Sequence, residues 1–256
     1  MFQKIKAQIP NIFTLLNLVF GCMAIIATVQ NGLIITDGAI PIDVPAKMLL
    51  ASLFIAIAAI IDFFDGFVAR LLGASSEMGK QLDSLADVVS FGVAPGMIVY
   101  QFLRLSFAQN ADGLDTNMIW LLPAFLIPCA GAYRLARFNI DTTQSTGFKG
   151  VPIPAAGLCI AAFPLIYAYT NNDFIYNTLK NEWFWYVIIF VISYLMVSTL
   201  PMLALKFKKL TFQKLLPFII VLSAGLLSSI FVGWASIVIG FFTYVTVSLI
   251  FKQKEV

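Results

Sequence analysis

Long apolar segments with few charged residues constrain this chain more than any other feature of its sequence. Of its 256 residues, 60% are hydrophobic and only 11% are charged. A bilayer core of about 30 Å is spanned by about 20 helical residues, and continuous apolar segments of this length favour helices. The eight predicted spans are residues 11–30, 47–72, 80–104, 118–138, 152–170, 183–200, 212–229 and 231–251. We therefore expect an all-α polytopic membrane protein.

The distribution of lysine and arginine predicts how these spans are oriented. With a cytoplasmic N-terminus, 13 of the 16 basic residues fall on the cytoplasmic side, and only Lys47, Arg104 and Lys180 fall outside. The cytoplasmic set is Lys4, Lys6, Arg70, Lys80, Arg134, Arg137, Lys149, Lys206, Lys208, Lys209, Lys214, Lys252 and Lys254. Such a bias keeps loops in the cytoplasm, so both termini are predicted there, in a bacterial cytoplasmic membrane.

Composition also excludes several kinds of chemistry. The chain has no histidine, so a general base must be a carboxylate, lysine, tyrosine or cysteine. Cys22, Cys129 and Cys159 lie far apart in apolar segments, which indicates neither a zinc site nor a disulfide framework. The net charge is only +3, and no basic run is interleaved with aromatic residues, so no nucleic-acid partner is expected.

Four aspartates lie within or at the ends of two neighbouring spans, where ionisable groups are costly and usually functional. They are Asp62, Asp65, Asp83 and Asp87. The first two are three residues apart and the last two are four apart, so each pair shares one face of a helix. A short turn around Gly73 separates the helices, which we expect to be antiparallel neighbours. The carboxylates should then converge at the cytoplasmic membrane boundary, which also holds the active site.

Converging carboxylates repel one another unless cations intervene, so this arrangement predicts bound metal. Oxygen ligands favour hard cations, Mg²⁺ first and then Mn²⁺ or Ca²⁺, and Mg²⁺ usually completes its shell with substrate phosphates. Gly66 and Gly79 would allow a ligand to come close, and Arg70 offers a permanent cation for phosphate. The spacing alone leaves an ion-coupled transporter open.

The run Asp62-x-x-Asp65-Gly66-x-x-Ala69-Arg70, eight residues, Gly79-x-x-x-Asp83-x-x-x-Asp87 resembles the signature of the CDP-alcohol phosphatidyltransferase family at every fixed position. The resemblance implies that Asp62, Asp65 and Asp83 hold two divalent cations, Mg²⁺ or Mn²⁺. It also implies that Asp87 lies near these metals and acts as base on the acceptor hydroxyl. The residues implied to bind the CDP moiety are Gly66, Ala69, Arg70 and Gly79.

The same resemblance implies how the chain is organised. We expect one integral-membrane domain over residues 1–256, with a six-helix catalytic core at 1–204 and an accessory helical hairpin at 205–256. A homodimer is also implied.

The first span carries a polar and small stripe on an otherwise apolar helix. Asn11, Thr14, Asn17 and Gly21 follow one another at steps of three, three and four residues. Small and hydrogen-bonding side chains favour close helix packing, and a substrate-lining face is the compatible alternative. On the second interpretation, Asn11 and Thr14 join the residues expected to bind the CDP moiety.

The acceptor alcohol depends on residues beside the signature. The segment 82–95 looks like the phosphatidylserine synthase branch, because the glycerophosphate-using relatives typically carry Pro where Ser84 stands and Lys where Val88 stands. The match extends to segments 9–17, 134–139 and 148–155. It implies CDP-diacylglycerol and L-serine as substrates, with inositol phosphate, glycerophosphate or choline as alternative acceptors.

Four residues further along the chain are candidates for binding the serine or a lipid phosphate. They are Arg134, Arg137, Asn139 and Lys149. The arginines are three apart at the cytoplasmic end of the fourth span, at the same membrane level as the aspartates. Anchoring of the protein by its positive charges is the alternative role for these residues.

Overall fold

The computed structural model describes residues 2–30, 47–73, 76–109, 115–141, 148–203 and 212–251. Side chains are described from residue 8 in the first of these ranges and from residue 215 in the last. Several parts of the sequence interpretation therefore lie outside the described residues, among them loop 31–46, the boundary at residue 204 and the lysines at 206, 208, 209, 252 and 254. The side chains of Lys4, Lys6 and Lys214 are outside them too.

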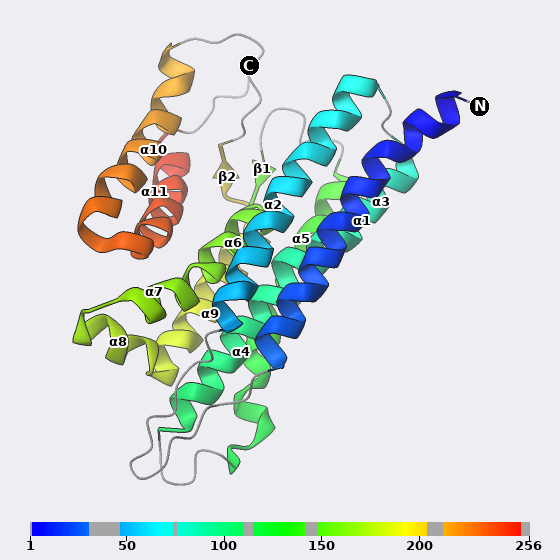
Figure 1. Cartoon of the computed structure of the whole chain (residues 1–256). Coiled ribbons are helices and arrows are strands. Elements are labelled where there is room, and N and C mark those ends of the chain that lie inside the picture. The colour runs from blue at the N-terminus through cyan, green and yellow to red at the C-terminus, as the bar shows by residue number, and fades with distance from the viewer. Residues whose placement is uncertain are drawn as a thin grey trace.

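Helices make up nearly all of the described chain (Figure 1). In chain order they are α1 (Phe2–Val29), α2 (Lys47–Leu72), α3 (Glu77–Asp87), the π-helix η1 (Val88–Val93), α4 (Ala94–Phe107), the 3₁₀ turns η3 (Met118–Trp120) and η4 (Leu122–Phe125), α5 (Leu126–Ile140), α6 (Ile153–Ala161), α7 (Phe163–Tyr169), α8 (Asp173–Leu179), α9 (Glu182–Val197), α10 (Phe212–Val232), the 3₁₀ turn η5 (Gly233–Ala235) and α11 (Ser236–Ile250). The strands β1 (Phe148–Lys149) and β2 (Pro201–Met202) are two residues each.

These elements confirm an all-α polytopic membrane protein. Four helical runs of the described chain are long and apolar enough to cross a membrane: Gln8–Val29, Lys47–Leu72, Glu77–Phe107 and Leu215–Ile250. Shorter apolar segments cover Ile153–Tyr169 and Glu182–Val197. With α5, and with the last run divided at η5, these segments correspond to the eight predicted spans.

Three local features differ from the prediction. Helix α3 begins at Glu77 because Ser76 caps it, its hydroxyl accepting the Gly79 N–H at 3.0 Å. The fifth span is broken between α6 and α7 at Ala162, just before Pro164, which has no N–H to donate. Helix α8 was not predicted and begins where Asn172 accepts hydrogen bonds from two backbone N–H groups.

Helix α1 packs against both of the helices that carry the aspartates. It packs against α2 along one side and against α3 and η1 along another, whereas α2 and α3 make little backbone contact with each other. The two helices meet, as expected, through their aspartate side chains rather than through close backbone packing. Because α1 packs against both helices, residues of α1 can reach both. The start of α1 and the connection from α2 to α3 lie at the same end of the bundle (Figure 1).

A small pair of strands joins the ends of α5 and α9. β1 and β2 run antiparallel, with Phe148 opposite Met202. The backbone then turns at Gly150, whose φ of 76° favours glycine, and the Gly150 N–H donates to Leu200 O at 2.9 Å. The next N–H, of Val151, donates to Leu195 O at 3.0 Å. This connection fixes the segment 148–151 against the end of α9 and against β2.

The hairpin of α10 and α11 stands at the side of the bundle (Figure 1). α11 attaches to it through Leu203, which follows β2. The Leu203 carbonyl accepts the Tyr244 hydroxyl at 3.1 Å, and its N–H donates to the Ser248 hydroxyl at 3.3 Å. Large apolar residues of α10, such as Leu222 and Leu226, are exposed, as expected of a helix that faces lipid.

Candidate active site

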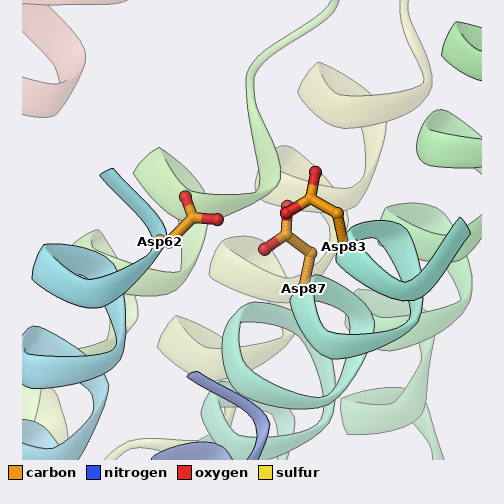
Figure 2. A group of neighbouring side chains, drawn as sticks. All are labelled: Asp62, Asp83 and Asp87. Carbon is orange, nitrogen blue, oxygen red and sulfur yellow. The ribbon is translucent and has the colours of Figure 1, made fainter. Parts of the chain in front are cut away.

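Three carboxylates from two helices meet at one point. Asp62 reaches from α2 toward Asp83 and Asp87, which lie one turn apart on α3 (Figure 2). One oxygen from each of the three lies within 4.8 Å of the others. Two charges about 4 Å apart repel by about 4 kcal/mol at an effective dielectric constant of about 20. The group is therefore costly unless a cation is bound between its members.

The polar contacts of this group fit a divalent metal. The Asp83 Oδ1 atom is buried and accepts no hydrogen bond from any residue that the structure describes. A buried carboxylate oxygen without a donor loses its hydration and gains nothing in return, which is expected of a ligand atom whose partner is a metal ion. All three side chains offer hard oxygen ligands. The described chain can thus hold a divalent cation between α2 and α3.

Asp65 lies on the same helix as Asp62 but has a different partner. It is only 7% exposed, and its Oδ2 atom accepts the Thr14 hydroxyl of α1 at 2.7 Å. It is outside the three-carboxylate group formed by Asp62, Asp83 and Asp87. Its role as a metal ligand stays a prediction. The Thr14 contact shows that the polar stripe of α1 faces the aspartates.

Asn17 is a site residue that the sequence interpretation left out of the predicted site. It is completely buried, and its amide nitrogen donates to Asp87 Oδ1 at 3.4 Å. The signal that could have identified it is its position in the stripe, three residues after Thr14. Since Thr14 contacts Asp65, the same helix face places Asn17 at the next carboxylate.

The residues predicted to bind the CDP moiety lie around α2 and the start of α3. A Cβ built on Gly66 would meet no protein atom within 4 Å, so there is room for a ligand beside the carboxylates. Ala69 is half-buried and Arg70 is exposed, with its Nε donating to the Gly66 carbonyl at 2.9 Å. A guanidinium held in this way still presents its terminal nitrogens to solvent or to a phosphate.

Gly79 and Asn11 mark a close approach of α3 to α1. A Cβ on Gly79 would lie 3.0 Å from Asn11 Oδ1 and 3.1 Å from the Ser76 hydroxyl. The Asn11 amide nitrogen donates to Gln8 at 3.0 Å. These contacts support the packing role of the stripe, and the CDP contact of both residues stays a prediction.

Arg137 is bound to backbone carbonyls of the protein. Its guanidinium donates to Val197 O at 2.6 Å, Ser198 O at 2.9 Å and Lys149 O at 3.3 Å. Two of these carbonyls lie at the C-terminal end of α9, where backbone oxygens lack partners within the helix. Arg137 therefore ties α5 to the end of α9 and to β1.

Asn139 and Lys149 also have protein partners. The Asn139 amide donates to the Ser84 hydroxyl at 2.8 Å, and its carbonyl accepts Lys80 Nζ at 3.2 Å. Lys149 forms a salt bridge of 3.0 Å with Asp141. Ser84 is one of the two positions that the sequence interpretation uses to choose the acceptor, and the structure links this position to α5.

Arg134 is the predicted acceptor residue that lies near the carboxylates. It is 5% exposed, and the nearby Asp87 carboxylate stabilises its positive charge. Its guanidinium also lies 5.5 Å from the centre of the Phe138 ring. A buried cation beside an acidic group can bind a substrate anion there.

Comparison with known proteins adds to this geometry. The model of the family described as CDP-alcohol phosphatidyltransferase matches residues 7–180.

The chain belongs to this family.

The region of the family match contains every predicted site residue, because these lie between Asn11 and Lys149. This CDP-alcohol phosphatidyltransferase resembles curated relatives from distant organisms. It is 40% identical over 117 residues to the CDP-diacylglycerol--serine O-phosphatidyltransferase of Bacillus subtilis (strain 168), covering 46% of this chain and 61% of the relative. It is 32% identical over 193 residues to the protein of that name in Helicobacter pylori (strain ATCC 700392 / 26695), covering 75% and 70%.

A third relative is the archaetidylserine synthase of Methanothermobacter thermautotrophicus, 32% identical over 165 residues, which are 64% of this chain and 60% of the relative. The chain thus spans about six to seven tenths of the length of the relatives described here.

Proposed function

We propose that this protein transfers the phosphatidyl group of CDP-diacylglycerol to L-serine, giving phosphatidylserine and CMP. The observation that carries the proposal is the convergence of Asp62, Asp83 and Asp87, with one buried oxygen that accepts no hydrogen bond from the described chain. Family membership supports the CDP-alcohol donor, and the names of the relatives support serine as the acceptor.

The proposed cofactor is a pair of divalent cations, Mg²⁺ or Mn²⁺. Asp62, Asp83 and Asp87 would hold it, and Asp65 would join them as the fourth ligand. When bound, two such cations neutralise a diphosphate and stabilise the attacking and leaving oxygens of a displacement. All four groups are carboxylates, and carboxylate oxygens are ligands that suit Mg²⁺ and Mn²⁺.

The chain's own residues supply the proton transfer and the binding of anions. Asp87 takes the proton of the serine hydroxyl, and that oxygen forms a bond to the phosphorus attached to diacylglycerol. The bond from this phosphorus to the CMP oxygen breaks, and Arg70 neutralises charge on the departing nucleotide. A positioned carboxylate base of this kind contributes about 10²- to 10⁴-fold to a rate.

The remaining predicted residues have roles around this centre. Arg134 would bind the serine carboxylate or a lipid phosphate, because its charge already interacts with Asp87. Asn11, Thr14, Gly66, Ala69 and Gly79 would line the site of the CDP moiety.

The arrangement in the cell belongs to the proposal as well. Water-soluble serine would enter from the cytoplasm and the lipid laterally, in a bacterial cytoplasmic membrane with both termini inside. A homodimer, with residues 1–204 as catalytic core and 205–256 as accessory hairpin, is the proposed assembly.

CMP release by the purified full-length protein tests the proposal. CDP-diacylglycerol would be supplied with serine, glycerol phosphate, inositol phosphate or choline, with Mg²⁺ and Mn²⁺ compared and chelator as control. We expect release that requires serine and a divalent cation. Release with another alcohol but none with serine would overturn the acceptor. Cation flux into vesicles in the absence of any CMP release would instead favour a transporter.

A further inference from the structure

Asn17 contacts both ends of one short stretch of the third spanning helix. Its side-chain amide donates to Asp87 Oδ1 at 3.4 Å, and its backbone carbonyl accepts the Ser90 hydroxyl at 3.0 Å. Asn17 and Ser90 are completely buried and Asp87 is 7% exposed. One residue of α1 therefore fixes the last residue of α3 and the middle of η1 at the same time.

The packing around this contact is close. Ser90 belongs to the π-helix η1, which begins immediately after Asp87. A Cβ built on Gly21, one helical turn beyond Asn17, would overlap the Ser90 hydroxyl. Only glycine lets α1 approach η1 this closely. Segments with π-helical geometry are rare and often lie at functional sites, so a specific contact that holds this one is informative.

The orientation of the Asn17 amide is set by the charge of Asp87. The Oδ1 atom of Asn17 is buried and accepts no hydrogen bond within the described part of the chain. Rotating the amide by 180° would place this oxygen against the Asp87 carboxylate, where two acceptors repel. The amide nitrogen must therefore face Asp87, although this leaves the Asn17 oxygen without a donor. An apolar residue would pack here without that penalty, so packing alone does not explain Asn17.

We propose that Asn17 is a positioning residue for Asp87: its amide orients this carboxylate toward Asp62 and Asp83, and the Ser90 contact fixes the backbone that carries it. This inference rests on the proposed function for its kinetic readout. It does not depend on which alcohol is the acceptor.

The chain offers a control between α1 and the same spanning run, Glu77–Phe107. The side-chain amide of Gln101 in α4 donates to the Thr28 carbonyl of α1 at 3.0 Å. Gln101 is also buried, but it lies 14 residues after Asp87 in the sequence. Gln101→Leu therefore removes a buried side-chain amide donor between this run and α1, as Asn17→Leu does, without reaching the carboxylates.

The experiment compares Asn17→Leu with Gln101→Leu in the full-length protein. Partners that orient metal-ligating groups typically contribute about 10- to 100-fold to activity or metal affinity. We expect Asn17→Leu to lower kcat for CMP release by about that factor, with KM for CDP-diacylglycerol changed less than about threefold. We also expect weaker Mn²⁺ binding, measured by spin resonance on the protein alone. Gln101→Leu should leave both values near wild type.

Asn17→Ala removes the donor without adding charge or bulk, so it serves if the leucine variant does not fold. A folded Asn17→Ala or Asn17→Leu protein with wild-type kcat and Mn²⁺ affinity would overturn the inference. So would equal losses in Asn17→Leu and Gln101→Leu. If the wild-type protein releases no CMP with any of the alcohols tested, the proposed function fails. Mn²⁺ binding alone then decides the role of Asn17.

Discussion

The acidic and the basic residues predicted for this site differ in what already binds them. Asp62, Asp83 and Asp87 converge, and the buried Asp83 Oδ1 accepts no hydrogen bond from the described residues. Arg137 and Lys149, by contrast, bind a set of backbone carbonyls and Asp141. In the first group a buried ligand atom has no protein donor among the described residues, whereas the second group holds parts of the protein together.

This difference teaches how to weigh a charge in a membrane protein. A charged side chain in an apolar chain is costly wherever it lies, and both groups therefore attract attention in the sequence. The hydrogen-bond and salt-bridge partners of each charged side chain show whether the protein itself offsets the cost of burying that charge. Arg134 shares the neighbourhood of the acidic group, because its charge interacts with Asp87.

The strongest test of the acidic group is Asp87→Asn. The amide cannot take a proton from the acceptor, so we expect kcat to fall by about 10²- to 10⁴-fold. Binding of CDP-diacylglycerol and Mn²⁺ should remain in part, because Asp62 and Asp83 are kept. Kinetics of CMP release and Mn²⁺ titration measure the two effects. Near-normal turnover would show that the base has been assigned wrongly.

Arg134→Leu tests whether a basic residue belongs with the acidic group. Hydrogen bonds to charged groups contribute about 1.5–3 kcal/mol, so we expect the KM for serine to rise by about 10- to 100-fold. Arg134→Lys is the control, because it keeps the charge but loses the planar fork and should retain part of the affinity. An unchanged KM in a folded leucine variant would place the anion site elsewhere.

Arg137→Leu is expected to reduce stability while leaving substrate affinity near wild type. The loss of charged hydrogen bonds to the end of α9 should lower the free energy of unfolding by about 1.5–3 kcal/mol. Thermal unfolding in detergent measures this effect, and KM for serine is the second readout. A wild-type melting temperature together with a tenfold higher KM for serine would contradict the structural role of Arg137, because Arg137 would then act on substrate.

Lys149→Ala should have the smallest effect. The lysine side chain is 44% exposed in its salt bridge with Asp141, and such pairs contribute about 0–1 kcal/mol. We expect a shift in melting temperature that disappears at high salt, and unchanged kinetics. Asp141→Asn is the matched variant, because it removes the other half of the same pair. A large increase in the KM for serine in Lys149→Ala alone would assign Lys149 to the acceptor site.

The sequence was sufficient for the fold class and for most of the acidic group. Apolar length locates the spans, and helical steps of three and four predict which aspartates share a face. It was insufficient for helix boundaries that depend on one residue. Pro164 does this at the break between α6 and α7, and Asn172 does it at the start of α8. Such boundaries depend on single caps and missing donors, which a count of apolar residues does not include.

The partners of individual side chains were also beyond the sequence. Helix α1 packs against both α2 and α3, and this packing brings Thr14 to Asp65 and Asn17 to Asp87. Arg134 and Arg137 are three residues apart and look equivalent in the sequence. Only the position of the end of α9 shows that Arg137 has carbonyls to bind.

The π-helix η1 makes the effect of a deletion depend on where it falls in this helical run. A π-helical turn holds about one residue more than an α-helical turn, and each residue of an α-helix accounts for about 100° of rotation. Deleting one residue from Val88–Val93 would close the wide turn to α-helical geometry, so the faces of α3 and α4 would keep their relative direction. Deleting one residue between Asp83 and Asp87, where α3 is regular, would instead turn Asp83 by about 100° relative to Asp87. Every aspartate would still be present, but Asp83 and Asp87 would no longer share one face.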